Sequence, residues 1–411
     1  MDDLLLKALA SEHGTPLYVY DGDMIRQRYN TFKNAFETRY SPVKVSYAMK
    51  ANSSLAVLKI FSSLGAGVDV VSGGELEVAL KAGFSAKDIL FTSNSKSPWE
   101  HELAVRKGAV INVDSVHEIQ SLSKVAASLG KKAKVSFRVN PSVNPQTHPK
   151  IATGLKNAKF GVPIEDGVAL EAYRQAKADS NLKVVGLHTH IGSQILETDS
   201  FRDAATRIMD FALQLKKELK IKLKFIDLGG GLGISYKGET NIIGPDDLAA
   251  AVVPVVEEGV KKLGYRPELW LEPGRWFVGP SGELIARVNS LKKTPDKKYA
   301  NVNAGFNVLI RPAMYDSFHR VRVLGKLGEE ETYDIAGNIC ESGDILAKDR
   351  KLPQIQEDDI ICLMDAGAYG FAMASNYNSW PLPAEVLVEA GKGRLIRQRG
   401  TTKDLLRNQI A

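Results

Sequence analysis

Cysteine is scarce in this chain of 411 residues, which contains only Cys340 and Cys362. Two cysteines exclude a framework of several disulfides and a cysteine-rich zinc site. Histidine is also sparse. Of the seven histidines only His188 and His190 are near neighbours, so this pair is the one candidate for a histidine cluster.

Long hydrophobic runs are missing as well, and no apolar stretch is long enough to cross a bilayer. The first residues, Met1-Asp2-Asp3-Leu4, carry acid where a secretory signal carries base, and the apolar run after them is too short. We therefore expect a cytoplasmic protein that has no membrane partner.

Neither sign of charge is in large excess, since 54 Lys and Arg face 48 Asp and Glu for a net charge of +6. The basic runs Lys216-Lys217 and Lys297-Lys298 have no aromatic residues between them, which favours a solvated face over a nucleic-acid site. Hydrophobic residues make up 44% of the chain and suffice for a sizeable core. The length suits one α/β barrel and one smaller domain.

Short apolar segments alternate with amphipathic helical segments from Lys44 to about Pro273. The eight expected strands are Lys44–Met49, Gly67–Val71, Ile89–Ser93, Val110–Asp114, Lys134–Asn140, Val184–Ile191, Phe225–Leu228 and Leu269–Glu272. The expected helices are Ser53–Leu64, Gly74–Ala82, Trp99–Lys107, Val116–Leu129, Ile164–Ala178, Phe201–Leu219 and Pro245–Leu263. This alternation predicts an α/β fold, a TIM-like (β/α)8 barrel, with an open doubly wound sheet as the alternative.

The pattern changes after Gly282, where strand-like segments continue but long helical segments are scarce. The strand-like segments are Glu283–Leu291, Val321–Leu324, Glu331–Ala336, Ile360–Leu363 and Ala384–Glu389. We expect a C-terminal, mostly-β domain, which the early strand Pro16–Tyr20 joins. The expected division is an N-terminal segment at 1–29, a barrel at 30–280 and the β domain at 281–411.

Residues suited to chemistry follow the first and sixth expected strands, and the active site of such a barrel gathers at these strand ends. Lys50 lies beside apolar residues in Tyr47-Ala48-Met49-Lys50, where its amine would lose protonation and become a nucleophile toward an aldehyde. Most lysines at strand ends simply reach water. His188 and His190 have the same strand parity. They would form part of a metal site, for which no third ligand is evident, or supply a flat ring that stacks on a cofactor.

The ends of the last two expected strands carry a run of glycines and two charged side chains. In Asp227–Gly233 a run of glycines lets backbone N–H groups cradle a phosphate, although such runs also form plain turns. Glu272-Pro273-Gly274-Arg275 supplies a carboxylate and a guanidinium, which would otherwise be a structural ion pair. Together the four strand ends offer an amine, a flat ring, a phosphate cradle and a carboxylate. These are the groups that pyridoxal 5′-phosphate (PLP) needs.

At this point the sequence resembles the diaminopimelate decarboxylase family of fold-type III PLP enzymes, which also include alanine racemase and the ornithine and arginine decarboxylases. The resemblance extends from Tyr18 to about Gly393. The matching motifs are Tyr47–Asn52, Asn140–Gly154, Lys159–Gly161, His188–Gln194, Asp227–Gly233, Glu272–Arg275, Cys340–Asp344 and Asp365–Tyr369. Cys340–Asp344 is the most specific of them. Asn338 stands where the family pattern has proline and leaves the cysteine motif intact.

The resemblance implies a role for each matching residue. Lys50 would hold PLP as a Schiff base, His190 would stack on its ring, Glu272 would pair with its ring nitrogen, and Asp69 would lie near Lys50. The phosphate would be held by Ser193, Gly230, Gly231, Gly233, Gly274, Arg275 and Tyr369. The substrate would be bound by Arg275, Arg311, Tyr315, Glu341 and Tyr369. Cys340 would act near the reacting carbon, and a homodimer would share its sites, with Cys340 and Glu341 coming from the partner.

The reaction that the resemblance implies is decarboxylation of meso-2,6-diaminopimelate at its D-centre to L-lysine and CO2, the last step of lysine biosynthesis. Alternatives are a decarboxylase of ornithine, arginine or carboxynorspermidine, an amino-acid racemase, or a non-catalytic PLP-binding homologue. The alternative for Cys340 is a small buried hydrophobic residue, which the flanking Glu341 and Asp344 disfavour. Without the resemblance, the segment Arg311–Tyr315 could equally be a surface turn.

Overall fold

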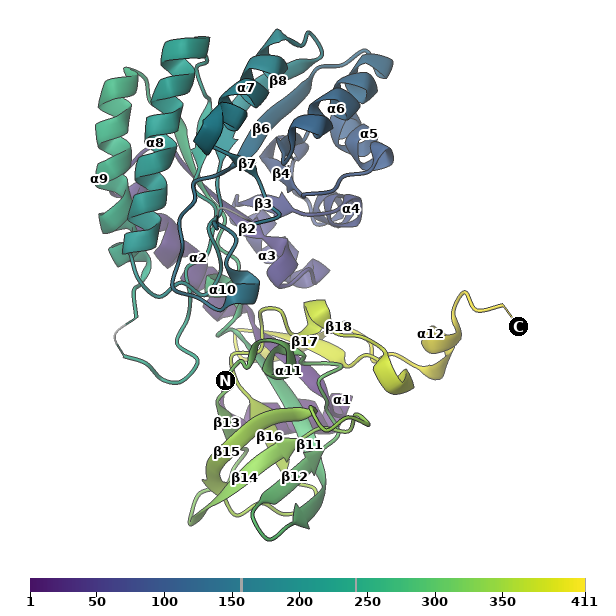
Figure 1. Cartoon of the computed structure of the whole chain (residues 1–411). Coiled ribbons are helices and arrows are strands. Elements are labelled where there is room, and N and C mark those ends of the chain that lie inside the picture. Colours follow the sequence, from purple (N-terminus) through teal and green to yellow (C-terminus); the bar gives the residue numbers. More distant parts are fainter. Residues whose placement is uncertain (156–157, 241, 411) are drawn as a thin grey trace. The chain divides into compact units, whose positions relative to one another are not determined.

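The computed structural model of the chain describes residues 1–155, 158–240 and 242–410. By its contacts the chain divides into two compact units. The barrel unit comprises Arg28–Ile234 and Asn241–Gly274, and the β unit comprises Met1–Gln27, Ser235–Thr240 and Arg275–Ala411. Figure 1 shows the helices and strands of both units.

The barrel unit is built on a ring of parallel strands. These are β2 (Val43–Ala48), β3 (Gly67–Val70), β4 (Ile89–Thr92), β5 (Val110–Val113), β6 (Ala133–Asn140), β8 (Leu182–His188), β9 (Phe225–Asp227) and β10 (Glu268–Leu271). The pairs β10–β2 and β5–β6 close the ring, and the short β7 (Val162–Pro163) pairs with β6 outside it. Closure confirms the predicted (β/α)8 barrel and rules out the open sheet.

Helices follow the strands and surround them (Figure 1). They are α3 (Leu55–Ser63), α4 (Gly73–Lys81), α5 (Pro98–Lys107), α6 (Val116–Ser128), α7 (Val168–Ala178), α8 (Asp199–Leu219) and α9 (Pro245–Leu263). Serine side chains cap several of them, as Ser72 accepts from the Glu75 N–H and Ser115 from the Glu118 N–H. The helix expected at Ile164–Ala178 is wrong at its start, because Asp166 and Gly167 have positive φ and helical geometry begins at Val168.

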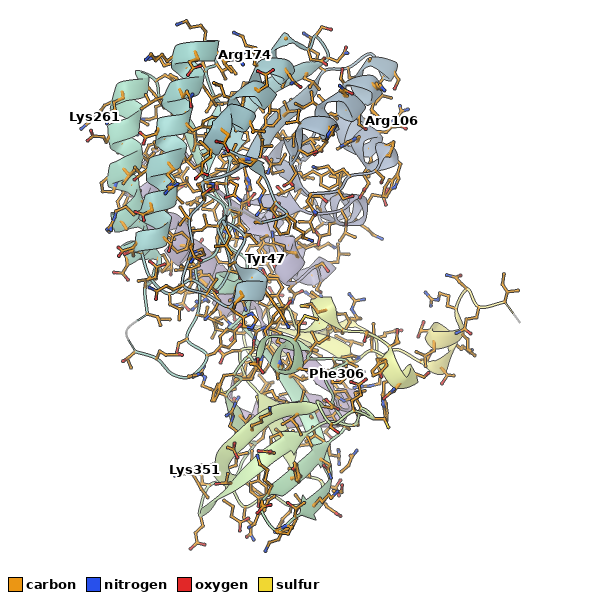
Figure 2. All side chains as sticks on the ribbon, in the orientation of Figure 1. Tyr47, Arg106, Arg174, Lys261, Phe306 and Lys351 are labelled. Atoms are coloured by element: carbon orange, nitrogen blue, oxygen red, sulfur yellow. The ribbon has the colours of Figure 1, made fainter. Side chains whose placement is uncertain are left out.

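Basic side chains lie on the outer faces of the barrel helices. Arg106 on α5, Arg174 on α7 and Lys261 on α9 point away from the strands (Figure 2). The side chains of Arg106 and Arg174 are 58% and 51% exposed, and each pairs with a glutamate of its own helix. These two arginines are therefore solvated. No described helix is long and apolar enough to span a membrane.

The β unit contains one sheet with strands from both ends of the chain. Its strands are β1 (Leu17–Asp21), β11 (Gly282–Lys293), β12 (Lys298–Val302), β13 (Val321–Val323), β14 (Glu330–Ala336), β15 (Ile345–Pro353), β16 (Ile360–Leu363), β17 (Ala384–Glu389) and β18 (Lys392–Arg397). The other helices of the chain are α1 (Asp3–His13), α2 (Gly22–Glu37), α10 (Arg275–Val278), α11 (Arg311–Tyr315) and α12 (Thr402–Leu406). β1 pairs with β11 and with β17, and Cys362 is buried in the core beneath them.

Candidate active site

Lys50 follows β2 in a single turn of 3-10 helix, Met49–Ala51. Its Nζ lies 2.7 Å from Oδ2 of Asp69, a fully buried carboxylate at the end of β3. The register of the two strands explains the contact, because Ala48 is paired directly with Asp69. Burial raises the pKa of Asp69, the charge of Glu272 raises it further, and Lys50 opposes both. Asp69 thus lies beside Lys50, where the resemblance puts it, and the amine has a carboxylate partner as well as the apolar neighbours expected at this strand end.

Glu272, directly after β10, is a buried carboxylate held by a histidine. Nε2 of His188 lies 3.1 Å from Oε2 of Glu272, and both side chains are almost fully buried. Burial raises the pKa of Glu272, but the charge and hydrogen bond of His188, together with Lys50 and His190, outweigh it and lower the pKa to about 2. An ionised carboxylate only accepts hydrogen bonds, so His188 donates here through Nε2. Glu272 is thus an anion aimed at the interior of the barrel end.

Asp227 ends β9 beside this pair and differs from Glu272 in its ionisation. Its Oδ1 accepts a hydrogen bond of 2.8 Å from the Gly229 N–H. Burial, reinforced by the charge of Glu272, raises the pKa of Asp227 well above its ordinary value. His188, Asp227 and Glu272 place potential metal-ligand atoms within 4.8 Å of one another, and this group does not include His190. The metal pair of His188 with His190 that the sequence suggested is therefore not the grouping that forms.

His190 presents a neutral ring at the end of the same region. Its Nδ1 accepts a hydrogen bond of 3.2 Å from the Gly230 N–H, and its carbonyl accepts from Arg138 Nη2 at 3.2 Å and from the Thr153 hydroxyl at 3.0 Å. Burial, with Arg138 and Lys50 nearby, lowers the pKa of His190 well below its ordinary value. The result is a flat, uncharged imidazole in a fixed orientation.

The glycines after β9 form a surface that admits no side chain. A Cβ atom at Gly230 would lie 2.1 Å from the Glu272 carbonyl oxygen, and one at Gly231, where φ is +124°, would lie 2.6 Å from the Gly192 carbonyl oxygen. The Ile195 N–H donates to the Gly231 carbonyl and the Gly233 N–H to the Ile195 carbonyl, each at 3.0 Å. These two loops therefore lie against each other, and Ser193 stands in the first of them.

The same atoms show that the four strand ends meet. Gly230 contacts Glu272 and also His190. A Cβ atom at Gly274 would lie 3.0 Å from the carbonyl oxygen of Ala48, two residues before Lys50. The barrel unit thus brings together all of its predicted site residues, namely Lys50, Asp69, His190, Ser193, Gly230, Gly231, Gly233, Glu272 and Gly274. An amine, a flat neutral ring, a bare backbone cradle and an ionised carboxylate fit the aldehyde, ring, phosphate and ring nitrogen of PLP.

Within the β unit, Arg275, Arg311 and Tyr369 gather around Tyr236. The Tyr236 hydroxyl accepts a hydrogen bond of 2.8 Å from Arg275 Nη1. The Arg311 guanidinium lies 4.5 Å from the centre of the Tyr236 ring, and that of Arg275 lies 4.8 Å from the centre of the Tyr369 ring. Tyr315 ends α11, which Arg311 begins. Both arginines are buried, so this cluster concentrates positive charge away from water.

Cys340 and Glu341 lie in the loop between β14 and β15. Cys340 is exposed, which removes the reading of a buried hydrophobic residue. Its N–H donates to Asn378 Oδ1 at 3.0 Å, and Glu341 accepts a hydrogen bond from the Tyr377 hydroxyl. Buried Asp344 holds the loop by accepting from the N–H groups of Ile339 and Phe306 at 2.7 and 2.6 Å. The motif therefore displays its cysteine and glutamate outward.

Comparison with known proteins places this geometry in a family. Residues 22–279 match the model of the pyridoxal-dependent decarboxylase, pyridoxal binding domain. The chain belongs to this family. It is 47% identical to the diaminopimelate decarboxylase of Archaeoglobus fulgidus, over 98% of this chain and 94% of that protein. It is 44% identical to the enzyme of the same name from Methanothermobacter thermautotrophicus, over 98% and 93%.

Solved structures of decarboxylases agree with the fold. Diaminopimelate decarboxylase from M. jannaschii in complex with L-lysine superposes with a TM-score of 0.94 at 40% identity, covering 98% of this chain and 94% of that one. The Helicobacter pylori enzyme complexed with L-lysine gives a TM-score of 0.91 at 39% identity and covers 98% of both chains. Both comparisons place the chain among the fold-type III decarboxylases.

Sequence reasoning missed Arg138 in the barrel unit, whose guanidinium donates to the His190 carbonyl. It also missed Tyr236 and His319 in the β unit, which contact Arg275 and Arg311. Arg138 offered a signal, because a charged residue inside the apolar strand Ala133–Asn140 needs a buried partner. Tyr236 and His319 offered none that could be read locally. Their importance comes from the side chains that the fold brings to them.

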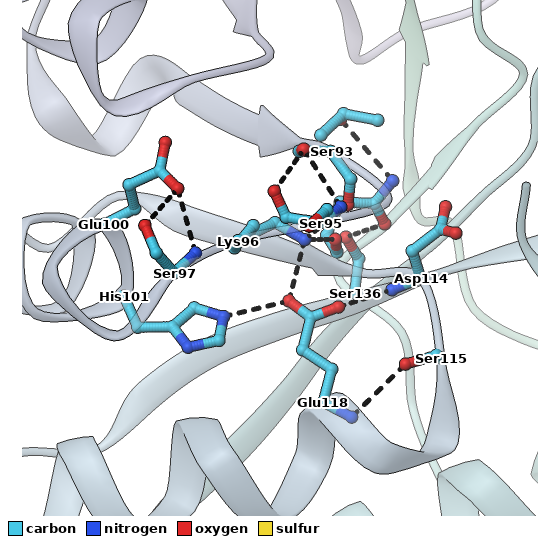
Figure 3. Close-up of polar contacts among 12 residues, drawn as sticks. Ser93, Ser95, Lys96, Ser97, Glu100, His101, Asp114, Ser115, Glu118 and Ser136 are labelled. Carbon is cyan, nitrogen blue, oxygen red and sulfur yellow. Dashed lines mark hydrogen bonds and ion pairs between the residues drawn. The ribbon is translucent and has the colours of Figure 1, made fainter.

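A second buried polar cluster of the barrel unit lies after β4 and β5 (Figure 3). Its centre is Lys96, whose side chain is fully buried. Lys96 Nζ donates to the carbonyl oxygens of Ser93 and Asn112 and to Oε1 of Glu118, each at 2.7 Å. Nε2 of His101 lies 3.1 Å from the same Glu118 oxygen. This ammonium ties the loop after β4 to the end of β5 and to α6.

We expect Lys96→Met to lower the free energy of unfolding by about 3 kcal/mol, because it leaves the Glu118 carboxylate buried without its ammonium. Urea unfolding followed by circular dichroism measures the loss. The double variant Lys96→Met/Glu118→Gln lacks the Glu118 carboxylate and should be more stable than the single variant. A double variant that is as unstable as the single one would show that the unpaired charge is not the cause.

Proposed function

We propose that this chain is a PLP-dependent carboxy-lyase that converts meso-2,6-diaminopimelate to L-lysine and CO2, as its relatives named diaminopimelate decarboxylase do. The surroundings of Arg311 carry the choice of substrate. In the described part of the chain, no carboxylate forms an ion pair with this buried guanidinium. A substrate with a second carboxylate would supply the missing anion, whereas ornithine would not.

The residues at the barrel end would hold PLP, which supplies an electron sink for the carbanion left when CO2 departs. Lys50 would provide the amine that holds its aldehyde. His190 would stack on its ring, and Glu272, whose pKa is lowered to about 2, would pair as an anion with the ring nitrogen and favour its protonated form. Ser193, Gly230, Gly231, Gly233 and Gly274, with Arg275 and Tyr369, would hold the phosphate. Asp69 orients the Lys50 amine.

Recognition of the substrate is assigned to the β unit. Arg275, Arg311 and Tyr315 would bind the distal carboxylate, and Tyr369 would line the same site. Two guanidiniums and a hydroxyl suit a carboxylate because they offer several donors in a fixed geometry. This grip would distinguish diaminopimelate from a diamino acid that has a single carboxylate.

Proton return to the former α-carbon is assigned to Cys340, and the distal amine of the substrate to Glu341. We propose that both come from the partner subunit of a homodimer with shared sites. Three features support this proposal: Cys340 is exposed, Glu341 is held outward by Tyr377, and Tyr377 and Trp380 leave 44% and 43% of their surface exposed. A cytoplasmic location is also proposed, supported by free Cys340 and Cys362.

A substrate panel tests the function. We expect the PLP-loaded enzyme to release CO2 from meso-diaminopimelate and to act on ornithine and arginine at least about 100-fold less efficiently, because these lack the distal carboxylate. Released CO2 and L-lysine are measured together. Turnover of ornithine without turnover of diaminopimelate would assign the chain to another decarboxylase, and epimerisation without CO2 would assign it to the racemases.

We expect Lys50→Ala to abolish the visible absorbance band of the PLP-loaded protein, because no amine remains to condense with the cofactor. The matched control is Lys44→Ala on the preceding strand β2, where Lys44 pairs with Asp88 at 2.6 Å. The control should keep the band. Persistence of the band in Lys50→Ala would contradict the cofactor assignment.

Mixing two inactive variants tests the shared site. Lys50→Ala and Cys340→Ala should each lose most activity, the second while it retains PLP. In mixed dimers one of the two sites carries neither substitution, so the mixture should regain up to about a quarter of the wild-type activity. The assay is decarboxylation after the two variants are co-incubated. If the mixture stays as inactive as its components, the sites are not shared.

A further inference from the structure

His319 is a fully buried residue of the β unit, and each of its two ring nitrogens has a hydrogen-bonding partner. Nδ1 lies 2.8 Å from the carbonyl oxygen of Met364, and Nε2 lies 2.9 Å from Nη1 of Arg311. A carbonyl oxygen can only accept and a guanidinium can only donate. The hydrogen of the neutral ring therefore sits on Nδ1, and Nε2 accepts from Arg311 through its lone pair.

The His319 ring stays neutral at neutral pH. Burial, together with the charge of Arg311, lowers the pKa of His319 to about 3. A protonated ring would turn Nε2 into a second donor that faces the guanidinium. The contact therefore depends on a neutral histidine, and its surroundings maintain that state.

Among the residues that the structure describes, neutral groups alone fix the Arg311 guanidinium. Nη1 donates to His319, Nη2 donates to the Ser317 hydroxyl at 3.2 Å, and the Tyr236 ring lies under the plane at 4.5 Å. Because none of these contacts brings a negative charge, the guanidinium is oriented without being neutralised. Burial and the nearby Arg275 lower the pKa of Arg311 to about 10, which still leaves it charged at neutral pH.

A carboxylate in the place of His319 would orient Arg311 equally well, but it would form an internal ion pair. Such a pair would reduce the attraction of Arg311 for any further anion. A neutral acceptor gives the geometry and leaves the charge available. Arg311 can therefore bind the anion of a ligand, whereas an arginine paired with an internal carboxylate would have a structural role.

We propose that His319 is a positioning residue for recognition of the substrate's distal carboxylate, because it orients Arg311 as a neutral acceptor and keeps its charge for the ligand. The inference deepens the proposed function and rests on its assignment of Arg311. His319 acts through Arg311 and has no contact with substrate in this scheme.

Two ligands that differ only in one carboxylate test the role of His319. L-Lysine carries this carboxylate, and 1,5-diaminopentane is the same molecule without the carboxylate. Calorimetry on the PLP-loaded enzyme gives the Kd of each, and the ratio of the two reports how strongly the protein binds the carboxylate. A general loss of structure would weaken both ligands together and leave the ratio unchanged.

Two replacements of His319 separate its two contacts. In His319→Gln the side-chain oxygen lies near the place of Nε2 and still accepts from Arg311. In His319→Asn the amide reaches Met364 but not Arg311. We expect Asn to weaken L-lysine about tenfold with 1,5-diaminopentane nearly unchanged, and Gln to keep L-lysine within about threefold of wild type, since one charged hydrogen bond is at stake.

Equal weakening of both ligands in His319→Asn, or no weakening of either, would overturn the role of His319. If that variant does not fold, His319→Glu decides, because it matches Gln in reach but neutralises Arg311 and should weaken L-lysine alone. Full L-lysine affinity in His319→Glu would equally overturn the proposal. A wild-type enzyme that shows no preference for L-lysine over 1,5-diaminopentane would refute the Arg311 assignment under the proposed function instead.

Discussion

Closure of the barrel by the β10–β2 pair is the interaction on which the candidate site depends. Leu271 pairs with Val45, and the Ala48 N–H donates to the Pro273 carbonyl at 3.3 Å, so the first and last strands of the ring end beside each other. Lys50 and Glu272 are more than two hundred residues apart in the chain, yet they lie at the same rim because of this pairing. Without this pair, β2 and β10 would be the two edge strands of the sheet, and Lys50 and Glu272 would lie apart.

Closure of the barrel gathers three buried carboxyl groups at the strand ends, and each is stabilised by its own neighbours. The Lys50 amine pairs with Asp69 and His188 pairs with Glu272, whereas burial, reinforced by the charge of Glu272, raises the pKa of Asp227 well above its ordinary value. The three carboxyl groups thus have three different environments and are not interchangeable. One of them is kept as a permanent anion, which is what a protonated ring nitrogen needs opposite it.

Local patterns predict the part of the site that lies on strand ends. Each of the eight barrel strands was expected within two or three residues of its observed limits, because buried parallel strands are continuously apolar. In the β unit, β12, β15 and β18 were not expected. Exposed charged residues interrupt the apolar pattern of β15 and β18, and β12 has only two fully buried residues, Ala300 and Val302. Tyr236 and His319 could not be assigned from sequence, because their roles arise from Arg275 and Arg311, which come near them only in the fold.

The pairing of β1 has a consequence for the order in which the protein is made. This strand lies near the start of the chain, but both of its neighbours, β11 and β17, are synthesised after the barrel is complete. During translation, residues 17–21 must wait with both edges unpaired while more than two hundred further residues emerge. The β unit therefore forms last, and a ribosome that stops before Ala384 releases a chain whose first strand has lost one of its two partners.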